Sequence, residues 1–307
     1  MQMSFGAPSR LHVNQLPVNG WQVNWVGQRV SFPAEAVTES LGLVNSWRQT
    51  CSGIEDTWVQ REYGVPTLWL KLDCVVDATS GTLGVYEIDD CPDGLGVSCL
   101  VNRPFARELD MLQSTWPAFR PVVADGRTTD DALWLSLETI RLETMNGYRG
   151  RILPRPHRLG DGRYAPLAER SVGPCLTQGS KRYGLRLGLW QPVQSEAELD
   201  WHESFVLKTP FGYGGSGIYI RHEGRLSGVT GKGKIRDAFQ KHGTLYRQPF
   251  IMPMTCPFDP GYLMVLRPFF GFDPLSGCYR FLGGFWLARP GNLKLHGAAD
   301  AIVGPLV

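Results

Sequence analysis

Two long apolar segments, residues 262–272 and 279–289, constrain the fold more than any other feature of the sequence. The residues between them include Asp273-Pro-Leu-Ser-Gly277, a combination that favours a tight turn. Two strand-like runs separated by such a turn predict a long antiparallel hairpin. This C-terminal hairpin indicates a mixed α+β protein in which antiparallel sheets dominate the second half.

The remaining apolar patterns alternate between strand-like and helix-like periods. Alternation of apolar and polar residues over 12–32 predicts strands, and an apolar stripe at helical spacing predicts a helix over 34–47. By the same criteria we expect strands at 67–76, 82–88, 121–125, 205–208, 218–220 and 245–251, and helices at 104–116, 129–144 and 234–241.

The length of 307 residues suffices for two domains, and residues 145–175 are rich in Gly, Pro and Arg. That stretch is the expected linker. We therefore expect an N-terminal α/β lobe over residues 1–170 and a second subdomain over residues 171–307.

Composition excludes several classes of function. With 31 Lys and Arg against 29 Asp and Glu, the chain has no broad basic face, so nucleic acid is not an expected partner. No apolar run is long enough for a membrane span, and the start does not resemble a signal peptide. The seven cysteines are scattered without a CxxC pair, which is typical of reduced thiols in a cytoplasmic protein.

A glycine-rich segment follows the strand predicted at 205–208. It contains Gly212, Gly214, Gly215, Ser216 and Gly217, and a second apolar strand follows it. Without Cβ atoms, such a loop can bring backbone N–H groups close to a phosphate, and Lys208 just before it adds a cation. The spacing matches neither GxxxxGK[ST] nor GxGxxG before a helix. The alternative is a flexible hairpin turn without a ligand.

Three carboxylates lie near the ends of the strands predicted around the turn at Ser80-Gly81. Glu87 and Asp89 share one strand face, and Asp73 on the neighbouring strand can join them. Three oxygen ligands of this kind suit Mg²⁺, which binds a few carboxylates together with substrate phosphates. The alternative is three solvated acids, but the flanking apolar residues place them at the mouth of a buried sheet.

Taken together, these motifs resemble the ATP-grasp ligases, and among them the circularly permuted group that includes glutathionylspermidine synthetase. The resemblance rests on Lys208 with its glycine loop, on 245–253 as a hinge strand, and on 282–289 as a strand ending in Arg289. The carboxylates precede the glycine loop, which is the permuted order. Lys71 and Asp89 stand where that group has Arg and Asn.

The resemblance implies two subdomains with mainly antiparallel sheets and a nucleotide cleft between them. It implies ATP and Mg²⁺ as cofactors, with the metal on Asp73, Glu87 and Asp89, and with Arg289 and Lys71 stabilising the transferred phosphoryl group. The residues expected to bind ATP are Lys181, Lys208, Gly212, Gly214, Gly215, Ser216, Gly217, Gln248, Pro249, Phe250, Ile251 and Arg267.

The implied activity is a carboxylate–amine ligase that forms an amide bond through an acyl phosphate. The alternatives are an ATP-grasp phosphotransferase and a non-catalytic nucleotide-binding or scaffold protein. The expected substrates are a small-molecule or peptide carboxylate and an amine, and a homodimer is the commonest assembly for such a chain. All of this requires that the acidic hairpin near residue 80 and the glycine hairpin near residue 212 face each other.

Overall fold

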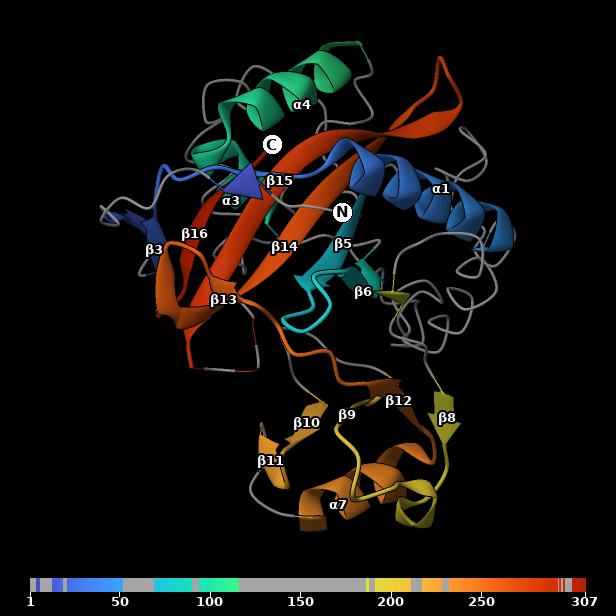
Figure 1. The fold of residues 1–307 in the computed structure, drawn as a ribbon. Helices are drawn as coiled ribbons and strands as arrows, with labels where there is room; N and C mark the ends of the chain where they lie inside the picture. The colour runs from blue at the N-terminus through green and yellow to red at the C-terminus, as the bar shows by residue number, and fades with distance from the viewer. Residues whose placement is uncertain are drawn as a thin grey trace.

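The computed structural model describes two lobes, each built on one sheet (Figure 1). The described residues are 4–5, 13–18, 21–51, 69–89, 94–115, 186–187, 191–210, 217–227, 232–291, 293, 295 and 300–307.

The large lobe contains an 11-stranded sheet in which the order is β1-β4-β16-β15-β14-β5-β6-β7, with β13 on β14 and the β2–β3 hairpin on β16. Its strands are β1 (Ser4–Phe5), β2 (Asn14–Val18), β3 (Trp21–Trp25), β4 (Val30–Ser31), β5 (Trp69–Val76), β6 (Leu83–Asp89), β7 (Arg186–Leu187), β13 (Thr255–Cys256), β14 (Asp259–Asp273), β15 (Cys278–Pro290) and β16 (Ile302–Leu306).

The β14–β15 hairpin forms the centre of this sheet, as the sequence predicts. Its two strands pair antiparallel from Tyr262 opposite Pro290 to Asp273 opposite Cys278, with a bulge between Phe269 and Phe270. β5 pairs antiparallel with the other edge of β14, and β6 then pairs with β5. The acidic hairpin is thereby joined to strands that come almost two hundred residues later in the chain.

Helices cover both faces of the hairpin. Phe269 packs against Phe105 of α4 (Arg103–Thr115), with ring centroids 5.4 Å apart, and α3 (Leu95–Val101) lies beside α4. The next residue, Phe270, faces the opposite side and packs against Phe281, which stacks on Phe32 just before α1 (Ala34–Cys51). The apolar residues of both faces form one continuous core.

The small lobe contains a five-stranded sheet in the order β11-β10-β9-β12-β8, with a single helix packed on it. Its elements are β8 (Gln191–Val193), the short 3-10 helix η4 (Glu196–Glu198), β9 (Phe205–Lys208), β10 (Ile218–His222), β11 (Arg225–Ser227), α7 (Lys232–His242) and β12 (Leu245–Pro249). Phe205 and Leu207 of β9 pack against Ile235 and Phe239 of α7 in a separate apolar core.

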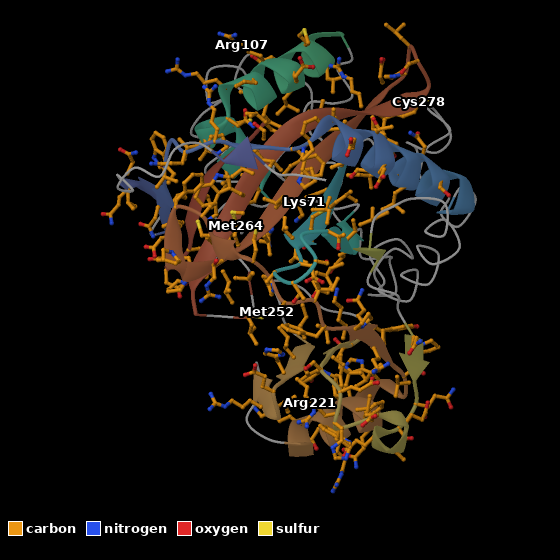
Figure 2. The ribbon with its side chains drawn as sticks, viewed as in Figure 1. Lys71, Arg107, Arg221, Met252, Met264 and Cys278 are labelled. Atoms are coloured by element: carbon orange, nitrogen blue, oxygen red, sulfur yellow. The ribbon has the colours of Figure 1, made fainter. Side chains whose placement is uncertain are left out.

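The small lobe is one continuous segment inserted between strands of the large sheet. Its exit runs through residues 250–254, and Met252 lies between the two lobes (Figure 2). Two backbone hydrogen bonds tie this connection to the acidic hairpin: Ala78 N–H donates to the Met252 carbonyl at 3.0 Å, and Met254 N–H to the Val76 carbonyl at 2.9 Å. The exit is therefore fixed to the turn region of the β5–β6 pair.

Most expected elements agree with the structure. The strand at 205–208 and the two hairpins are confirmed, with shifts of a few residues at their ends. The strand expected at 121–125, the helix at 129–144, the linker at 145–175 and the boundary at residue 170 lie outside the described residues. The large sheet takes strands from both sides of residue 170. β16 is not expected from its sequence, because Gly304 and Pro305 interrupt it.

Two further expectations concern thiols and membranes. Within the described ranges, Cys74, Cys99, Cys256 and Cys278 are all free thiols. In that same part of the chain, we find no helix with the length and apolar character required to cross a membrane.

Candidate functional site

The β5–β6 pairing places the predicted acidic residues on one face of the large sheet. Asp73 lies directly opposite Glu87, and Lys71 lies opposite Asp89. Residues two apart on a strand share a face, so all four positions lie on the same side. The sequence predicts this grouping of Asp73, Glu87 and Asp89; the side chain of Asp89 is outside the description.

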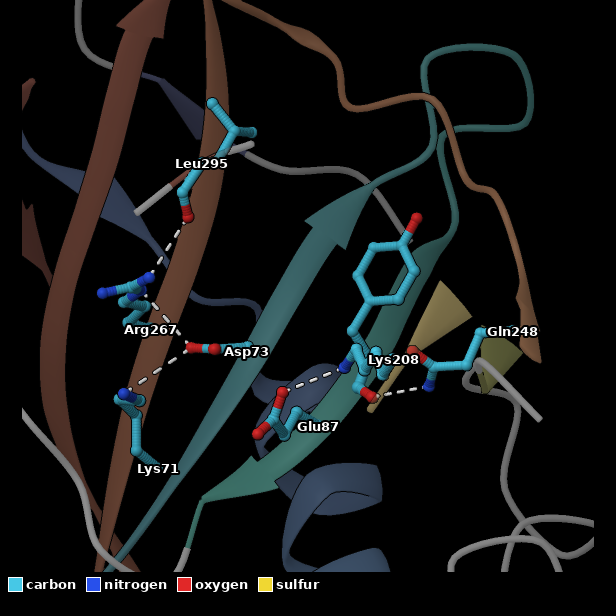
Figure 3. A network of polar contacts seen from close by, with 8 residues as sticks. Lys71, Asp73, Glu87, Lys208, Gln248, Arg267 and Leu295 are labelled. Atoms are coloured by element: carbon cyan, nitrogen blue, oxygen red, sulfur yellow. Dashed lines mark hydrogen bonds and ion pairs between the residues drawn. The ribbon is translucent and has the colours of Figure 1, made fainter. Parts of the chain in front are cut away.

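Asp73 lies between two cationic side chains of the large sheet (Figure 3). Its Oδ1 is 3.3 Å from Arg267 Nε and 3.8 Å from Lys71 Nζ. Arg267 also donates from its other end to the Leu295 carbonyl at 3.2 Å and lies over the ring of Phe285. Lys71 is only 3% exposed. An ammonium group this deep in a sheet is costly without anionic neighbours, which Asp73 provides.

Lys208 reaches across from the small lobe to the large one. Its Nζ donates to Glu87 Oε2 at 2.9 Å, although the two residues are 121 positions apart in the chain (Figure 3). Lys208 ends β9, immediately before the glycine-rich segment, and is 3% exposed. This contact confirms that the acidic hairpin and the strand before the glycine loop meet.

Gln248 and Tyr86 make a second connection between the lobes. Gln248 Nε2 donates to the Tyr86 carbonyl at 2.8 Å. The Tyr86 hydroxyl donates to the Ile251 carbonyl at 2.8 Å and accepts from the Ile251 N–H at 2.6 Å. Gln248 thus contacts the backbone of the residue that precedes Glu87, whereas Ile251 contacts the Tyr86 hydroxyl.

Tyr86 is a residue that the sequence interpretation missed. It precedes Glu87 on β6, so its side chain lies on the opposite face of the strand from the carboxylates. A polar aromatic residue on an otherwise apolar strand face is the signal that points to it, because a buried phenol hydroxyl needs hydrogen-bond partners.

Arg289 is held by a partner that follows it in the chain. Its Nε and one terminal nitrogen donate to the two carboxylate oxygens of Asp300, at 2.8 and 2.9 Å. Arg289 lies opposite Leu263, and Phe285 lies opposite Arg267, so Arg289 and Arg267 share a sheet face. Arg289 as a whole residue is 7% exposed, and the bidentate pair fixes the orientation of its guanidinium group.

The described end of the glycine segment is closed by a backbone bond. Thr209 N–H donates to the Gly217 carbonyl at 2.9 Å, and a side chain at Gly217 (φ 65°) would collide with the Thr209 side chain. Glycine is therefore required where the loop re-enters β10. The other predicted loop residues and Lys181 lie outside the described residues: Gly212, Gly214, Gly215 and Ser216.

The remaining hinge residues lie at the end of β12. Phe250 packs its ring against His222, with centroids 4.5 Å apart, and its N–H donates to the Ser204 carbonyl at 3.4 Å. Pro249 pairs with Phe205 at the last position of the strand. This end of the small sheet therefore presents an aromatic pair next to the connection between the lobes.

The charges of this site suit a polyphosphate more than a bare metal ion. Lys71, Lys208 and Arg267 are cationic and surround the carboxylates of Asp73 and Glu87. In the described portion of the chain, no three His, Cys, Asp or Glu side chains gather as a ready metal-ligand group. Asp73 Oδ1 is buried and accepts no hydrogen bond from any residue that the structure describes. Two carboxylates fit Mg²⁺, which keeps several water or phosphate ligands.

Cys74 follows Asp73 on β5. Complete burial, with the Asp73 carboxylate beside it, raises the pKa of the Cys74 thiol well above its usual value. The thiol therefore stays protonated at neutral pH, which disfavours thiolate chemistry at Cys74.

Comparison with known proteins identifies no family. No protein-family model and no curated protein matches the chain. Among solved structures, a glutathione synthetase-like effector (GSS30) from Globodera pallida in its apo form is 11% identical; the match covers 90% of this chain and 88% of that one at a TM-score of 0.43. A Methylobacillus flagellatus KT protein provisionally designated gamma-glutamylcysteine synthetase is also 11% identical. That match covers 87% of this chain and 85% of the other at a TM-score of 0.40.

Proposed function

We propose that this protein is an ATP- and Mg²⁺-dependent carboxylate–amine ligase. The observation that carries the proposal is the 2.9 Å contact between Lys208 and Glu87, which joins the strand before the glycine loop to the acidic hairpin. The residue types needed to bind phosphates and a divalent cation thus meet where the two lobes touch.

In this proposal each group has one task. Asp73 and Glu87, with Asp89 on the same strand face, hold Mg²⁺, which when bound neutralises charge on the phosphates. Lys208 and the glycine loop bind the phosphates nearer the base. The hinge end of the small sheet, Gln248 to Phe250, lies beside the base.

The cations of the large sheet act on the group being transferred. Lys71 and Arg267 flank Asp73, so both are placed to stabilise negative charge that develops as the γ-phosphoryl moves to a substrate carboxylate. Arg289 is proposed to act at the same end of the site, oriented by Asp300. ADP is the leaving group of the phosphoryl transfer. Attack of an amine on the acyl phosphate then forms the amide and releases inorganic phosphate and the amine's proton. The protein contributes positioning and charge stabilisation rather than a covalent intermediate.

The first test is thermal unfolding of the full chain with ATP and Mg²⁺. A ligand at one hundred times its Kd adds about 2.7 kcal/mol of stability, so the native chain should unfold at a clearly higher temperature. Lys208→Gln should lose most of this shift. Arg236→Gln changes a mostly exposed cation on the far side of the small sheet and is the matched control.

The product then separates a ligase from a phosphotransferase. Incubation with ATP, Mg²⁺ and mixtures of amino acids, peptides and polyamines should give free phosphate together with an amide. A phosphorylated hydroxyl as the product would replace the ligase with a kinase-type reaction. A native chain that nucleotide and metal do not stabilise would remove the nucleotide site altogether.

A further inference from the structure

Lys208 and Glu87 bind each other, although each is also proposed to bind a part of the ligand. This pairing affects which form of a polyphosphate the site can bind. The inference rests on the proposed function, in which Glu87 is a metal ligand and Lys208 a phosphate ligand. In the structure the two bind each other at 2.9 Å. The Lys208 side chain is 4% exposed, whereas that of Glu87 is 29% exposed and therefore open to an arriving cation.

We propose that Glu87 is a specificity-determining residue that makes this site select the metal complex of a polyphosphate over the free anion. It does so by holding the Lys208 ammonium until a divalent cation takes the carboxylate. Glu87 is thereby a selector for the metal-loaded nucleotide.

Consider first a polyphosphate that arrives without a metal. It must compete with Glu87 for Lys208, and the displaced carboxylate then faces the phosphate charge at short range. Like charges in a poorly solvated site repel strongly, so the free anion binds weakly.

Consider next a divalent cation that arrives alone. To bind Glu87 it must separate the carboxylate from a nearly buried ammonium group, and removing one partner of a buried pair is costly. When metal and polyphosphate arrive together, the cation takes Glu87 and a phosphate oxygen takes Lys208. The phosphate replaces Glu87 as the partner of Lys208, and the cation neutralises the Glu87 charge that would repel the phosphate. Each ligand therefore raises the affinity of the site for the other, which is positive coupling.

Asp73 differs from Glu87 in the lobe from which its cationic partners come. It lies directly opposite Glu87, but its cationic neighbours, Lys71 and Arg267, belong to the large sheet. Among the described side chains, Glu87 is the proposed metal ligand that forms an ion pair with a cation of the small lobe, Lys208.

The test measures binding rather than turnover, by calorimetry with ATP in excess EDTA and with ATP in excess Mg²⁺. Glu87→Gln keeps the size of the side chain but removes the carboxylate charge that pairs with Lys208. We expect metal-free ATP to bind this variant about tenfold tighter than the native chain, within the range usual for coupled sites. Mg²⁺-ATP should bind it more weakly, so the preference for the metal complex collapses.

Two control variants test whether the tighter binding of metal-free ATP by Glu87→Gln depends on Lys208. Glu203→Gln removes a carboxylate of the small lobe that pairs with Arg247 and lies outside the proposed site, and it should change neither affinity. The double variant Glu87→Gln/Lys208→Gln should lose the tighter binding of metal-free ATP. A gain that survives in the double variant contradicts the inference.

A reciprocal measurement does not depend on the Glu87 variant. Lys208→Gln leaves Glu87 without the ammonium, so Mn²⁺ alone, followed by electron paramagnetic resonance, should bind this variant severalfold tighter than the native chain. Unchanged Mn²⁺ affinity in Lys208→Gln, or unchanged metal-free ATP affinity in Glu87→Gln, overturns the inference while the nucleotide site stands. A native chain that binds ATP in neither condition overturns the proposed function and the selector together.

Discussion

The large sheet and the small sheet bury their central strands in different ways. In the large sheet, the β14–β15 hairpin packs against α4 on one face and against Phe32 and α1 on the other, so apolar residues are buried on both faces. In the small sheet, α7 covers only the face of β9 that carries Phe205 and Leu207. The opposite face carries Lys208 and, on the neighbouring strand, Gln248; both are buried and bind the large lobe.

The apolar packing that stabilises each lobe is therefore distinct from the polar contact on which the proposed site is built. Each lobe has its own apolar core, and the two cores share no buried residue among those that the structure describes. In the described residues, Lys208 and Gln248 join the small lobe to the large one through polar contacts, an ion pair and a hydrogen bond. A junction of this kind can rearrange at a smaller energetic cost than either core, because exchange of polar partners leaves the apolar packing intact.

The largest expected effect comes from emptying the small core. Phe205→Ala removes a fully buried ring that packs against Trp201, and should lower the free energy of unfolding of the small lobe by about 3–5 kcal/mol. Hydrogen exchange should show lost protection in residues 191–249 and retained protection in β14 and β15. Equal loss of protection in both sheets would mean that the lobes unfold as one unit. It would contradict the distinction drawn between the two cores.

An intermediate effect is expected at the connection between the lobes. Tyr86→Phe removes the hydroxyl that bonds both peptide groups of Ile251, which is 1% exposed. Leaving a buried donor and acceptor unmet should cost about 1–3 kcal/mol, and the Ile251 amide should exchange faster. Tyr219→Phe on β10 is the matched control. A Tyr86→Phe variant with native exchange at Ile251 would show that the hydroxyl does not hold the connection.

The smallest effect is expected on the outside of the small lobe. Glu203 pairs with Arg247, but the Glu203 side chain is 57% exposed. Exposed ion pairs contribute about 0–1 kcal/mol, so Glu203→Gln should leave the unfolding midpoint in urea almost unchanged. A loss as large as that of Tyr86→Phe would mean that surface pairing, rather than the connection, stabilises this lobe.

The sequence is most informative where one local period decides the structure. Residues 205–208 are predicted as a strand and form β9, and the alternation along β5 and β6 correctly places Asp73 and Glu87 on one face. Both predictions depend only on neighbouring residues and on the period of two. The contact between Lys208 and Glu87, by contrast, cannot be predicted from local periods. The order of the motifs along the chain is what leads to that prediction.

The sequence is least informative where a residue's role depends on distant partners. Asn102 donates to the carbonyls of Gly284 and Leu306, and its side-chain oxygen accepts from Phe105 N–H at the start of α4. Its neighbours in sequence indicate at most a helix cap. Tyr86 and Asp300 are missed for the same reason, because their partners are set by the packing of whole elements. β16 is missed because its burial depends on strands from both ends of the sequence.

The strand order of the large sheet also determines the sequence in which the protein can fold as it is synthesised. β5 and β6 leave the ribosome long before β14, and β16, which lies between β15 and the early strands β3 and β4, comes later still. Pairings between such distant segments form slowly, because a long loop must close first. All five strands of the small sheet lie within residues 191–249. On a nascent chain the small sheet therefore has all its strands available first, and the large sheet closes around its earlier half only when the last strands emerge.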